Sequence, residues 1–240
     1  MDLNEHYRFW LHTRKPECDY YERATDIPVS ASCARIGREN DSFAGLGKLS
    51  KLVELEASNA NQDMLEEISR LSALQYLDLG WPLVAKDLTP LLALENLQVL
   101  KIDSPRHMTD FSPLSKLPKL ERLFLTNAKH CDNLDWLRPL KNQLIALGIE
   151  GSTWTKHTIP TLEPLNGFAL EALFLTNTKL ADQDLSPLAT MRNLRFLGTA
   201  LNAPKAEFMA LKARNAGLEC SWFDEALWAT FKDPRPPKQS

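Results

Sequence analysis

Two eight-residue segments of this chain are nearly identical. Residues 120–127 read LERLFLTN and residues 170–177 read LEALFLTN, so they differ at one position. Aligned on the pattern that they share, LxxLxL, seven segments start 22 to 26 residues apart, and all seven keep the first two leucines. These segments start at Leu52, Leu74, Leu97, Leu120, Leu144, Leu170 and Leu194, and a degenerate eighth starts at Leu218. A pattern that returns with a period of about 20 to 50 residues indicates stacked structural repeats.

Each repeat combines a strand pattern with a turn pattern. The six residues of LxxLxL are too few for a helix, and their alternating leucines predict a short strand. Between strands a second phrase recurs, which reads DLTPLLALENL from Asp87, DFSPLSKLPKL from Asp110 and DLSPLATMRNL from Asp184. The Asp and Pro mark entry into a short helix or 3₁₀ turn, whose leucines point inward. No unit buries its apolar face alone, so we expect the units to stack on one leucine core.

These phrases resemble the leucine-rich repeat family, specifically the short-repeat class of the internalins and of the repeat subunit that regulates protein phosphatase 1. The resemblance covers about residues 43–223. It implies an α/β fold, a leucine-rich repeat solenoid: a right-handed arc with a parallel β-sheet on the concave face, short helices or 3₁₀ turns on the convex face, and N- and C-terminal caps. The family usually has Asn at the ninth position of each unit. Here that position holds Pro82, Pro105, Ala128, Ser152, Thr178 and Asn202, so the asparagine ladder is mostly absent, and the hydroxyls of Ser152 and Thr178 are candidate substitutes.

The predicted organisation has four parts. They are an N-terminal cap with an opening strand (1–42), the repeats (43–217), a capping strand and helix (218–232) and a disordered tail (233–240). The opening strand is expected from Val29, which lies 23 residues before Leu52. The last helical return is expected to close at Gly217. The N-terminal cap is rich in aromatic residues, namely Tyr7, Phe9, Trp10, Tyr20 and Tyr21.

Several aromatic residues are predicted on the concave face. Residues that flank the inward leucines point away from the core and form columns from strand to strand. Tyr76, Phe124, Phe174 and Phe196 lie in these columns. Folding does not require aromatic rings there, and exposed rings beside charges are typical of interface hot spots. We therefore predict that these rings contact a partner; the alternative is that flanking loops or the caps cover them.

The same columns carry charges. The N-terminal units contribute Glu54, Glu56 and Asp78, and the middle units contribute Lys101 and Arg122. A partner with a basic patch would meet the first group. The alternative is an ordinary solvated strand face. The residues of these columns that we predict to bind a partner are the four aromatic residues and also Asp78, Lys101 and Arg122.

Two tryptophans are expected at the rim of the coil. The longest repeat has 26 residues and contains GSTWTKHTIPTLEPLNG, in which Trp154 lies. Insertions in repeat proteins map to loops on one side, which is often the binding side. Trp81 follows the strand of the second unit at a similar edge. Each tryptophan either anchors a partner or packs over the coil, and Trp154 is included in the predicted partner site.

We expect no catalytic centre, no cofactor and no metal site. His107 and His130 recur at one repeat position, with Cys131 beside the second and His157 in the next loop. This arrangement imitates a metal site, but the repeat period alone explains the spacing. No phosphate-binding loop, zinc-protease motif or serine-hydrolase motif is present in the sequence.

Composition limits the partners and the location. The net charge of −3 lacks the basic footprint of nucleic-acid binders, so no nucleic acid is expected. No apolar run approaches the roughly 20 residues that cross a bilayer, and the N-terminus lacks a signal-peptide pattern, so no membrane is expected. The four cysteines lie far apart without a CxxC spacing, which suits free thiols in a reducing compartment. We therefore predict a cytoplasmic protein.

The predicted function is a non-catalytic scaffold that recognises another protein on its concave face. Whether it inhibits that partner, as an immunity protein or a regulatory subunit would, or recruits it stays open. The alternative is a structural or self-associating repeat protein with no separate partner. On its own the chain is expected to be a monomer.

Overall fold

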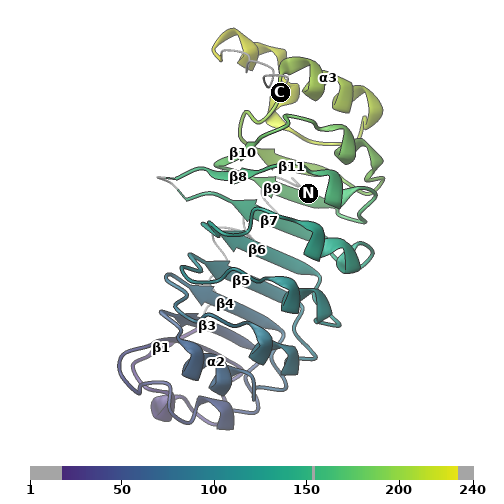
Figure 1. The fold of residues 1–240 in the computed structure, drawn as a ribbon. Coiled ribbons are helices and arrows are strands. Elements are labelled where there is room, and N and C mark those ends of the chain that lie inside the picture. The colour runs from purple at the N-terminus through teal and green to yellow at the C-terminus, as the bar shows by residue number, and fades with distance from the viewer. Residues whose placement is uncertain (1–17, 153–154, 232–240) are drawn as a thin grey trace.

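The computed structural model describes residues 18–152 and 155–231. Within these ranges nine parallel strands form one sheet, and their order in the sheet follows their order along the chain. They are β1 (Tyr20–Tyr21), β2 (Cys33–Gly37), β3 (Glu54–Ser58), β4 (Tyr76–Gly80), β5 (Val99–Asp103), β6 (Arg122–Thr126), β7 (Ala146–Glu150), β9 (Ala172–Leu175) and β11 (Phe196–Thr199). Each repeat therefore adds one strand beside the last, and the sheet runs the length of the molecule (Figure 1).

The chain returns between strands mostly through 3₁₀ turns. They are η2 (Ala24–Asp26), η3 (Leu46–Lys48), η4 (Thr89–Ala93), η5 (Ser112–Lys116), η6 (Asp135–Leu140), η7 (Glu163–Leu165), η8 (Ser186–Thr190), η9 (Ser221–Phe223) and η10 (Glu225–Ala229). Two returns are α-helices, α2 (Gln62–Ile68) and α3 (Lys205–Arg214), near opposite ends of the sheet (Figure 1). In the described ranges no helix is long and apolar enough to span a bilayer.

The repeated Asp explains where three of these turns begin. Each carboxylate accepts a hydrogen bond from the first backbone N–H of its turn, and the distances are Asp87 Oδ1 to Thr89 N 2.8 Å, Asp110 Oδ1 to Ser112 N 2.8 Å and Asp184 Oδ1 to Ser186 N 2.7 Å. A Pro occupies the first turn in all three. The carboxylate thus satisfies a donor that a helix start leaves unpaired. The predicted short helical returns are confirmed.

One leucine from each repeat forms a ladder through the core. The first leucine of every LxxLxL is at most 1% exposed, and these are Leu52, Leu74, Leu97, Leu120, Leu144, Leu170 and Leu194. Burial of such a side chain contributes about 1.5–3 kcal/mol. Each leucine is buried by its neighbours in adjacent repeats, so the core is continuous along the solenoid. The predicted fold class is confirmed.

Asparagines after the strands occupy the eighth position of the repeat, one residue before the ninth position, where the family usually has Asn. Asn59, Asn127 and Asn177 have φ of 57°, 54° and 50°, in the left-handed region, and Ser104 in the same position has φ of 51°. Asn tolerates this conformation better than most residues. At the ninth position Thr178 Oγ1 donates a hydrogen bond to the Ile149 carbonyl at 2.7 Å, as expected of a hydroxyl substitute.

The longest repeat differs from the expected loop. Its residues His157–Ile159 form β8, which pairs in parallel with β10 (Thr178–Leu180) as a second, two-stranded sheet. Gly151 permits this close approach, because a Cβ there would lie 2.1 Å from the Asn177 carbonyl oxygen. The prediction of an irregular insertion over this stretch is therefore wrong for these three residues. Trp154 lies outside the described residues.

Both ends of the solenoid depart from the predicted alignment. β2 pairs Cys33 with Glu54, a separation of 21 residues instead of the expected 23, and Val29 is 80% exposed. At the C-terminus α3 ends at Arg214, before Gly217, whose φ lies outside the left-handed region. The expected last strand is only a bridge between Phe196 and Glu219, followed by η9 and η10. The tail 233–240 lies outside the described residues.

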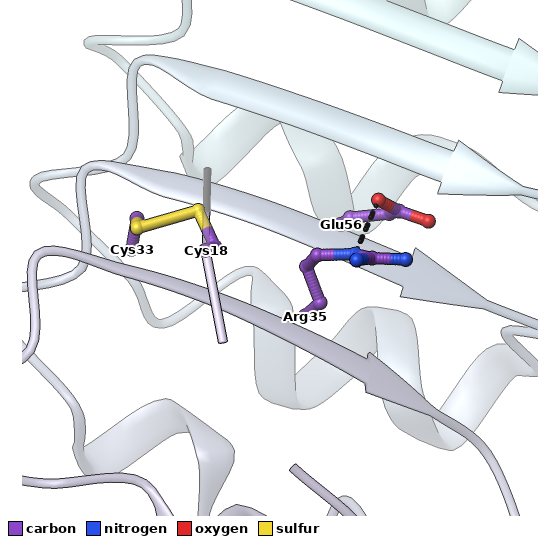
Figure 2. The surroundings of a disulfide bond; sticks show 4 residues. All are labelled: Cys18, Cys33, Arg35 and Glu56. Atoms are coloured by element: carbon purple, nitrogen blue, oxygen red, sulfur yellow. Dashed lines mark hydrogen bonds and ion pairs between the residues drawn. A yellow bond between two sulfur atoms is a disulfide. The ribbon is translucent and has the colours of Figure 1, made fainter. Parts of the chain in front are cut away.

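The prediction of four free thiols is wrong for one pair. Cys18 and Cys33 form a disulfide with a Cα–Cα distance of 5.5 Å (Figure 2). Cys131 and Cys220 are free, and burial raises the pKa of the Cys131 thiol to about 12 and of the Cys220 thiol to about 11. The pair was missed because its proximity depends on how the chain before β2 folds back, which no spacing motif encodes.

Candidate functional site

The concave face is the side of the nine-stranded sheet turned away from the helical returns. Strand register places two columns of side chains across it. The first contains Cys33, Glu54, Tyr76, Val99, Arg122, Ala146, Ala172 and Phe196. The second contains Arg35, Glu56, Asp78, Lys101, Phe124, Gly148, Phe174 and Gly198. The columns predicted from the repeat alignment are confirmed.

Seven apolar residues of these columns form a cluster separate from the leucine core, which we call the concave cluster. They are Tyr76, Val99, Phe124, Ala146, Ala172, Phe174 and Phe196. The aromatic members are 4%, 3%, 2% and 7% exposed in chain order. The expectation that these rings would be exposed is therefore wrong, and the alternative that they are covered describes them better. The leucine core does not require aromatic rings on the outer face of the sheet, nor that such rings be this well buried.

The rings fit together because small residues alternate with them. Phe124 and Phe174 meet edge to face with centroids 6.2 Å apart, and Phe174 and Phe196 are 5.2 Å apart. Gly148 lies in register with Phe124 and Phe174, and Gly198 lies beside Phe174. A Cβ on Gly198 would lie 3.0 Å from Phe174 Cδ1 and 3.1 Å from Phe196 Cε1. The rings thus occupy the space that the two glycines leave.

The N-terminal half of the concave face carries paired charges. Arg35 Nε donates to Glu56 Oε2 at 2.8 Å, beside the disulfide (Figure 2). Lys101 Nζ lies 3.9 Å from Asp78 Oδ2 and 5.7 Å from the centroid of the Tyr76 ring. Side chains of both pairs are only 11–31% exposed. The predicted acidic patch is therefore partly neutralised within the protein.

Arg122 is the other predicted cation of the concave face. Its Nη1 lies 3.1 Å from Glu121 Oε2, and its side chain is 26% exposed. It is in register with Val99 and Ala146 of the concave cluster. The structure thus places a partly accessible guanidinium at the edge of the apolar rings, a combination that interface hot spots favour.

A buried carboxyl lies at the end of β7. Glu150 is 3% exposed, and the Thr176 hydroxyl donates a hydrogen bond to its Oε1. Burial raises the pKa of Glu150 to about 7. Its charge state therefore changes near neutral pH.

The rim at the carboxyl ends of the strands holds exposed groups and two cavities. Trp81 is 61% exposed, and the Arg106 guanidinium lies 5.4 Å from its ring centroid. A cavity of about 370 Å³ lies there, lined by Trp81, Ser104, Pro105, Arg106, Asn127 and Lys129. A second cavity, of about 420 Å³, shares Asn127 and Lys129 and extends to His157. The rim is thus accessible where the concave cluster is not.

The histidine and cysteine arrangement noted in the sequence has a structural explanation. His157 is buried, its Nε2 lies 2.8 Å from the Cys131 carbonyl oxygen, and burial lowers the pKa of its ring. Within the described ranges no group of three or more His, Cys, Asp or Glu side chains is placed to hold a metal. The contact instead ties β8 to the preceding repeat.

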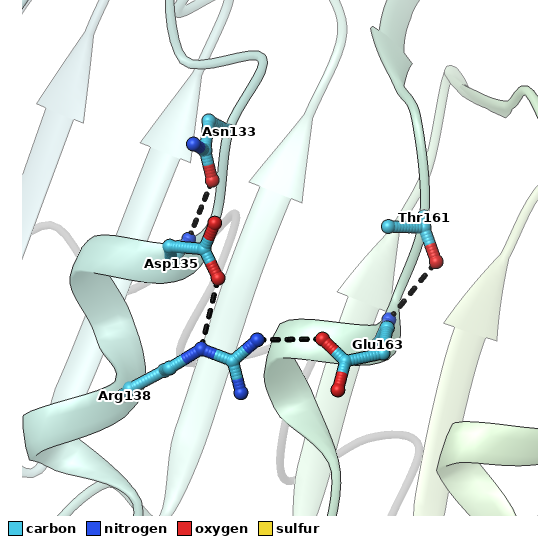
Figure 3. Close-up of polar contacts among 5 residues, drawn as sticks. All are labelled: Asn133, Asp135, Arg138, Thr161 and Glu163. Carbon is cyan, nitrogen blue, oxygen red and sulfur yellow. Dashed lines mark hydrogen bonds and ion pairs between the residues drawn. The ribbon is translucent and has the colours of Figure 1, made fainter.

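Charged contacts on the helical side also join repeats. Arg138 Nε donates to Asp135 Oδ1 at 2.8 Å within η6, and its Nη2 donates to Glu163 Oε2 of η7 at 2.5 Å (Figure 3). Asn133 Oδ1 and Thr161 Oγ1 accept hydrogen bonds from the first backbone N–H of the two turns. These groups repeat the capping role of the Asp residues, so we interpret them as structural.

Several solved structures resemble this chain, although no protein-family model and no curated protein matches it. Internalin C2 of Listeria monocytogenes is 28% identical with a TM-score of 0.53, over 70% of this chain and 68% of that protein. A leucine-rich repeat protein of Leptospira interrogans is 21% identical with a TM-score of 0.56, over 84% and 51% of the two chains. TLR13, solved in a complex with single-stranded RNA, is 17% identical with a TM-score of 0.50, over 75% and 31%. This chain thus spans about two thirds of internalin C2 and about half or less of the others. All three have the fold that the repeat phrases predict.

Proposed function

We propose that this chain, a leucine-rich repeat protein, is a non-catalytic scaffold that binds another protein through its concave face and the adjoining rim. The observation that carries the proposal is the concave cluster. It places four aromatic rings and flanking charged pairs outside the leucine core, on a sheet face that the repeats hold in register. Aromatic and arginine side chains surrounded by polar groups are the composition of protein interfaces.

The rim supplies the accessible part of this surface. Trp81 and Arg106 are stacked together, and tryptophan and arginine are the residue types most enriched among interface hot spots. Arg122 is a partly accessible cation of the concave face, in register with Val99 and Ala146 of the concave cluster. A partner that engaged these groups first would approach the concave cluster from its edge. Inhibition of that partner is the finer proposal, because a bound solenoid would occlude the surface it grips.

The test is affinity capture with variants of accessible residues. Charge substitution of Phe124 and Phe174, which are buried, would disturb folding as well as binding. Trp81→Ala and Arg122→Glu are better choices, and Val29→Glu is the matched control because Val29 is 80% exposed. We expect a protein that wild type and Val29→Glu retain and that the two site variants lose. Loss of a hot-spot side chain typically raises Kd about thirtyfold or more. Equal retention by all four would move the site elsewhere and overturn the proposal.

Two other partner classes are tested directly. We also propose a monomer that binds no nucleic acid; the net charge of −3 opposes phosphate binding and supports the second part. A mobility-shift assay with single-stranded RNA at low salt should show no retention. Light scattering should show one chain per particle. A dimer that Trp81→Ala, a change at an exposed side chain, dissolves would instead favour the self-associating alternative.

The proposed compartment depends on the disulfide. The sequence favours the cytoplasm, whereas the Cys18–Cys33 pair favours an oxidising environment, where disulfides persist. Thiol trapping in cells of the native source decides between them. Trapping with an alkylating reagent before lysis should leave this pair unlabelled if the compartment is oxidising.

A further inference from the structure

We propose that the rim at the carboxyl ends of the strands binds an acidic, extended segment of the partner protein. The binding groups are four basic side chains, one from each of four consecutive repeats, which we call the basic row. They are Arg106, Lys129, Lys156 and Lys179. This assignment of the partner's chemistry rests on the protein-binding function proposed above.

The basic row follows the repeat period. Arg106, Lys129 and Lys179 each lie nine residues after the first leucine of their repeat. In the longest repeat Lys156 takes this place, directly before β8. Because β8 and β10 pair in register, Thr158 lies opposite Lys179, and both are exposed between buried neighbours. Side chains alternate along a strand, so Lys156 points to the same outer side as Thr158.

The charges of the basic row are exposed and are not neutralised by the protein itself. Within residues 18–152 and 155–231 every ion pair involves other residues, so no member of the row has an acidic partner there. The cations of the concave face differ in this respect, because Arg35, Lys101 and Arg122 each lie beside a carboxylate. The basic row is therefore the set of cations that a carboxylate from another molecule can reach and pair with.

The rim is positively charged although the whole chain is negatively charged. Its segments run from the end of a strand to the cap of the following 3₁₀ turn, and they are residues 81–86, 104–109, 127–132, 155–160 and 177–183. Together they contain five Lys or Arg residues against two Asp residues, a net charge of +3, whereas the chain carries −3. A patch of one sign attracts a partner of the opposite sign and raises its association rate. The charge of the rim therefore selects an acidic partner.

Two adjoining cavities lie along the basic row. Arg106 and Lys129 line the cavity of about 370 Å³, and Lys129 and Lys156 line the cavity of about 420 Å³. Among the described residues that line the first cavity there is no Asp or Glu. A carboxylate that entered it would meet the Arg106 guanidinium, whose planar fork of N–H groups suits a carboxylate. The cavities thus accept acidic side chains where the row supplies the opposite charge.

An extended peptide fits the basic row better than a nucleic acid does. Adjacent strands are about 4.8 Å apart, so the row spans about 14 Å over its four repeats. A peptide at about 3.3 Å per residue covers this length with four or five residues. Asp132 is exposed and lines the cavity that Lys129 and Lys156 share. Its carboxylate would repel each phosphate of a polynucleotide, whereas a peptide can place an uncharged residue beside it.

Fluorescence anisotropy with a labelled hexaglutamate peptide at low salt tests the basic row without the natural partner. The row variant is Lys129→Glu/Lys156→Glu. The control is Lys51→Glu/Lys116→Glu, which makes the same charge change at exposed lysines outside the rim. We expect the row variant to raise Kd about tenfold, because each reversal replaces an attraction by a repulsion, and the control to stay within about threefold of wild type. No binding by wild type, equal binding of hexaglutamine, or an equal loss in both variants would overturn the proposal.

A second measurement uses the wild-type chain alone and so covers the case in which the row variant does not fold. A hexaglutamate peptide that carries benzoylphenylalanine at one end is photo-crosslinked to the protein. We expect crosslinks to the rim segments that contain Trp81, Arg106 or Lys129, and crosslinks mainly to other regions would overturn the proposal. Displacement of the peptide by oligouridylate at a lower concentration than by unlabelled hexaglutamate would also overturn it, in favour of a nucleic acid.

The two proposals fail separately. Failure of the peptide tests leaves affinity capture with Trp81→Ala and Arg122→Glu as an independent test of protein binding. Failure of affinity capture leaves the binding of an acidic peptide to the basic row standing.

Discussion

Phe174→Ala is the substitution that most directly measures the concave cluster. Phe174 is 2% exposed and contacts the rings of Phe124 and Phe196. Its in-register neighbours on both sides, Gly148 and Gly198, have no side chains that could fill the gap left by the ring. The cavity therefore collapses poorly, and collapse is what reduces the cost of a large-to-small substitution.

The expected loss follows from burial and cavity terms together. Phe→Ala in a well-packed site costs about 3–5 kcal/mol, and we expect about 3–4 kcal/mol here because the cluster has the sheet on one side only. For a chain of this size each kcal/mol lowers Tm by about 2–4 °C, so Tm should fall by about 6–16 °C. Urea unfolding followed by circular dichroism gives the free energy, and calorimetry gives Tm.

Val29→Ala is the control for this measurement. Its side chain is 80% exposed, so its loss should stay within about 0.5 kcal/mol. If Phe174 stood on an open face, its truncation would cost a similarly small amount. A loss below about 1 kcal/mol for Phe174→Ala would therefore refute the claim that the concave rings are packed.

Three further predictions concern other parts of the molecule. Burial raises the pKa of Glu150 from 4.5 to about 7, so its protonation stabilises the fold fully below pH 4.5, and this contribution, about 3 kcal/mol at most, is lost as pH rises through 7. Glu150→Gln should therefore flatten the pH dependence of the free energy of unfolding between pH 4.5 and 7. An unchanged slope in this variant would contradict the prediction. Asp110→Ala removes the acceptor for the Ser112 N–H and should cost about 1 kcal/mol by urea unfolding, whereas no loss would argue against the capping role. Alkylation of the oxidised chain in denaturant should label two cysteines, Cys131 and Cys220, and four labels by intact mass would show that the disulfide is absent.

The repeat period was sufficient to predict most of the fold. The first leucine of each unit keeps its position, because each strand has one side that faces the core and the repeats stack only when this side recurs at a nearly constant spacing. Once Leu120 and Leu170 are aligned, the register of every residue between them follows, which is why Phe124 and Phe174 were placed correctly in one column. The capping Asp residues were found for the same reason, since each lies at a constant distance from a leucine.

The irregular regions were predicted less well, because the period does not reach them. The opening strand lies 21 residues from β3 instead of the predicted 23, since no leucine pattern in residues 29–37 defines its register. β8 escaped notice because three residues carry too little periodicity to indicate a strand. The asparagines with positive φ were visible in the sequence at Asn59, Asn127 and Asn177, and a search at the eighth position would have found them.

The sequence by itself determined which residues face the leucine core and which face outward, because both follow from the alternation of side chains along a strand and the constant repeat length. Only the tertiary structure decided what lies against the outward residues. Burial of Phe124, the pairing of Cys18 with Cys33 and the raised pKa of Glu150 all depend on contacts between segments far apart in the chain. A repeat pattern specifies contacts between neighbouring units, and it contains no information about contacts that non-repetitive parts of the chain make with them.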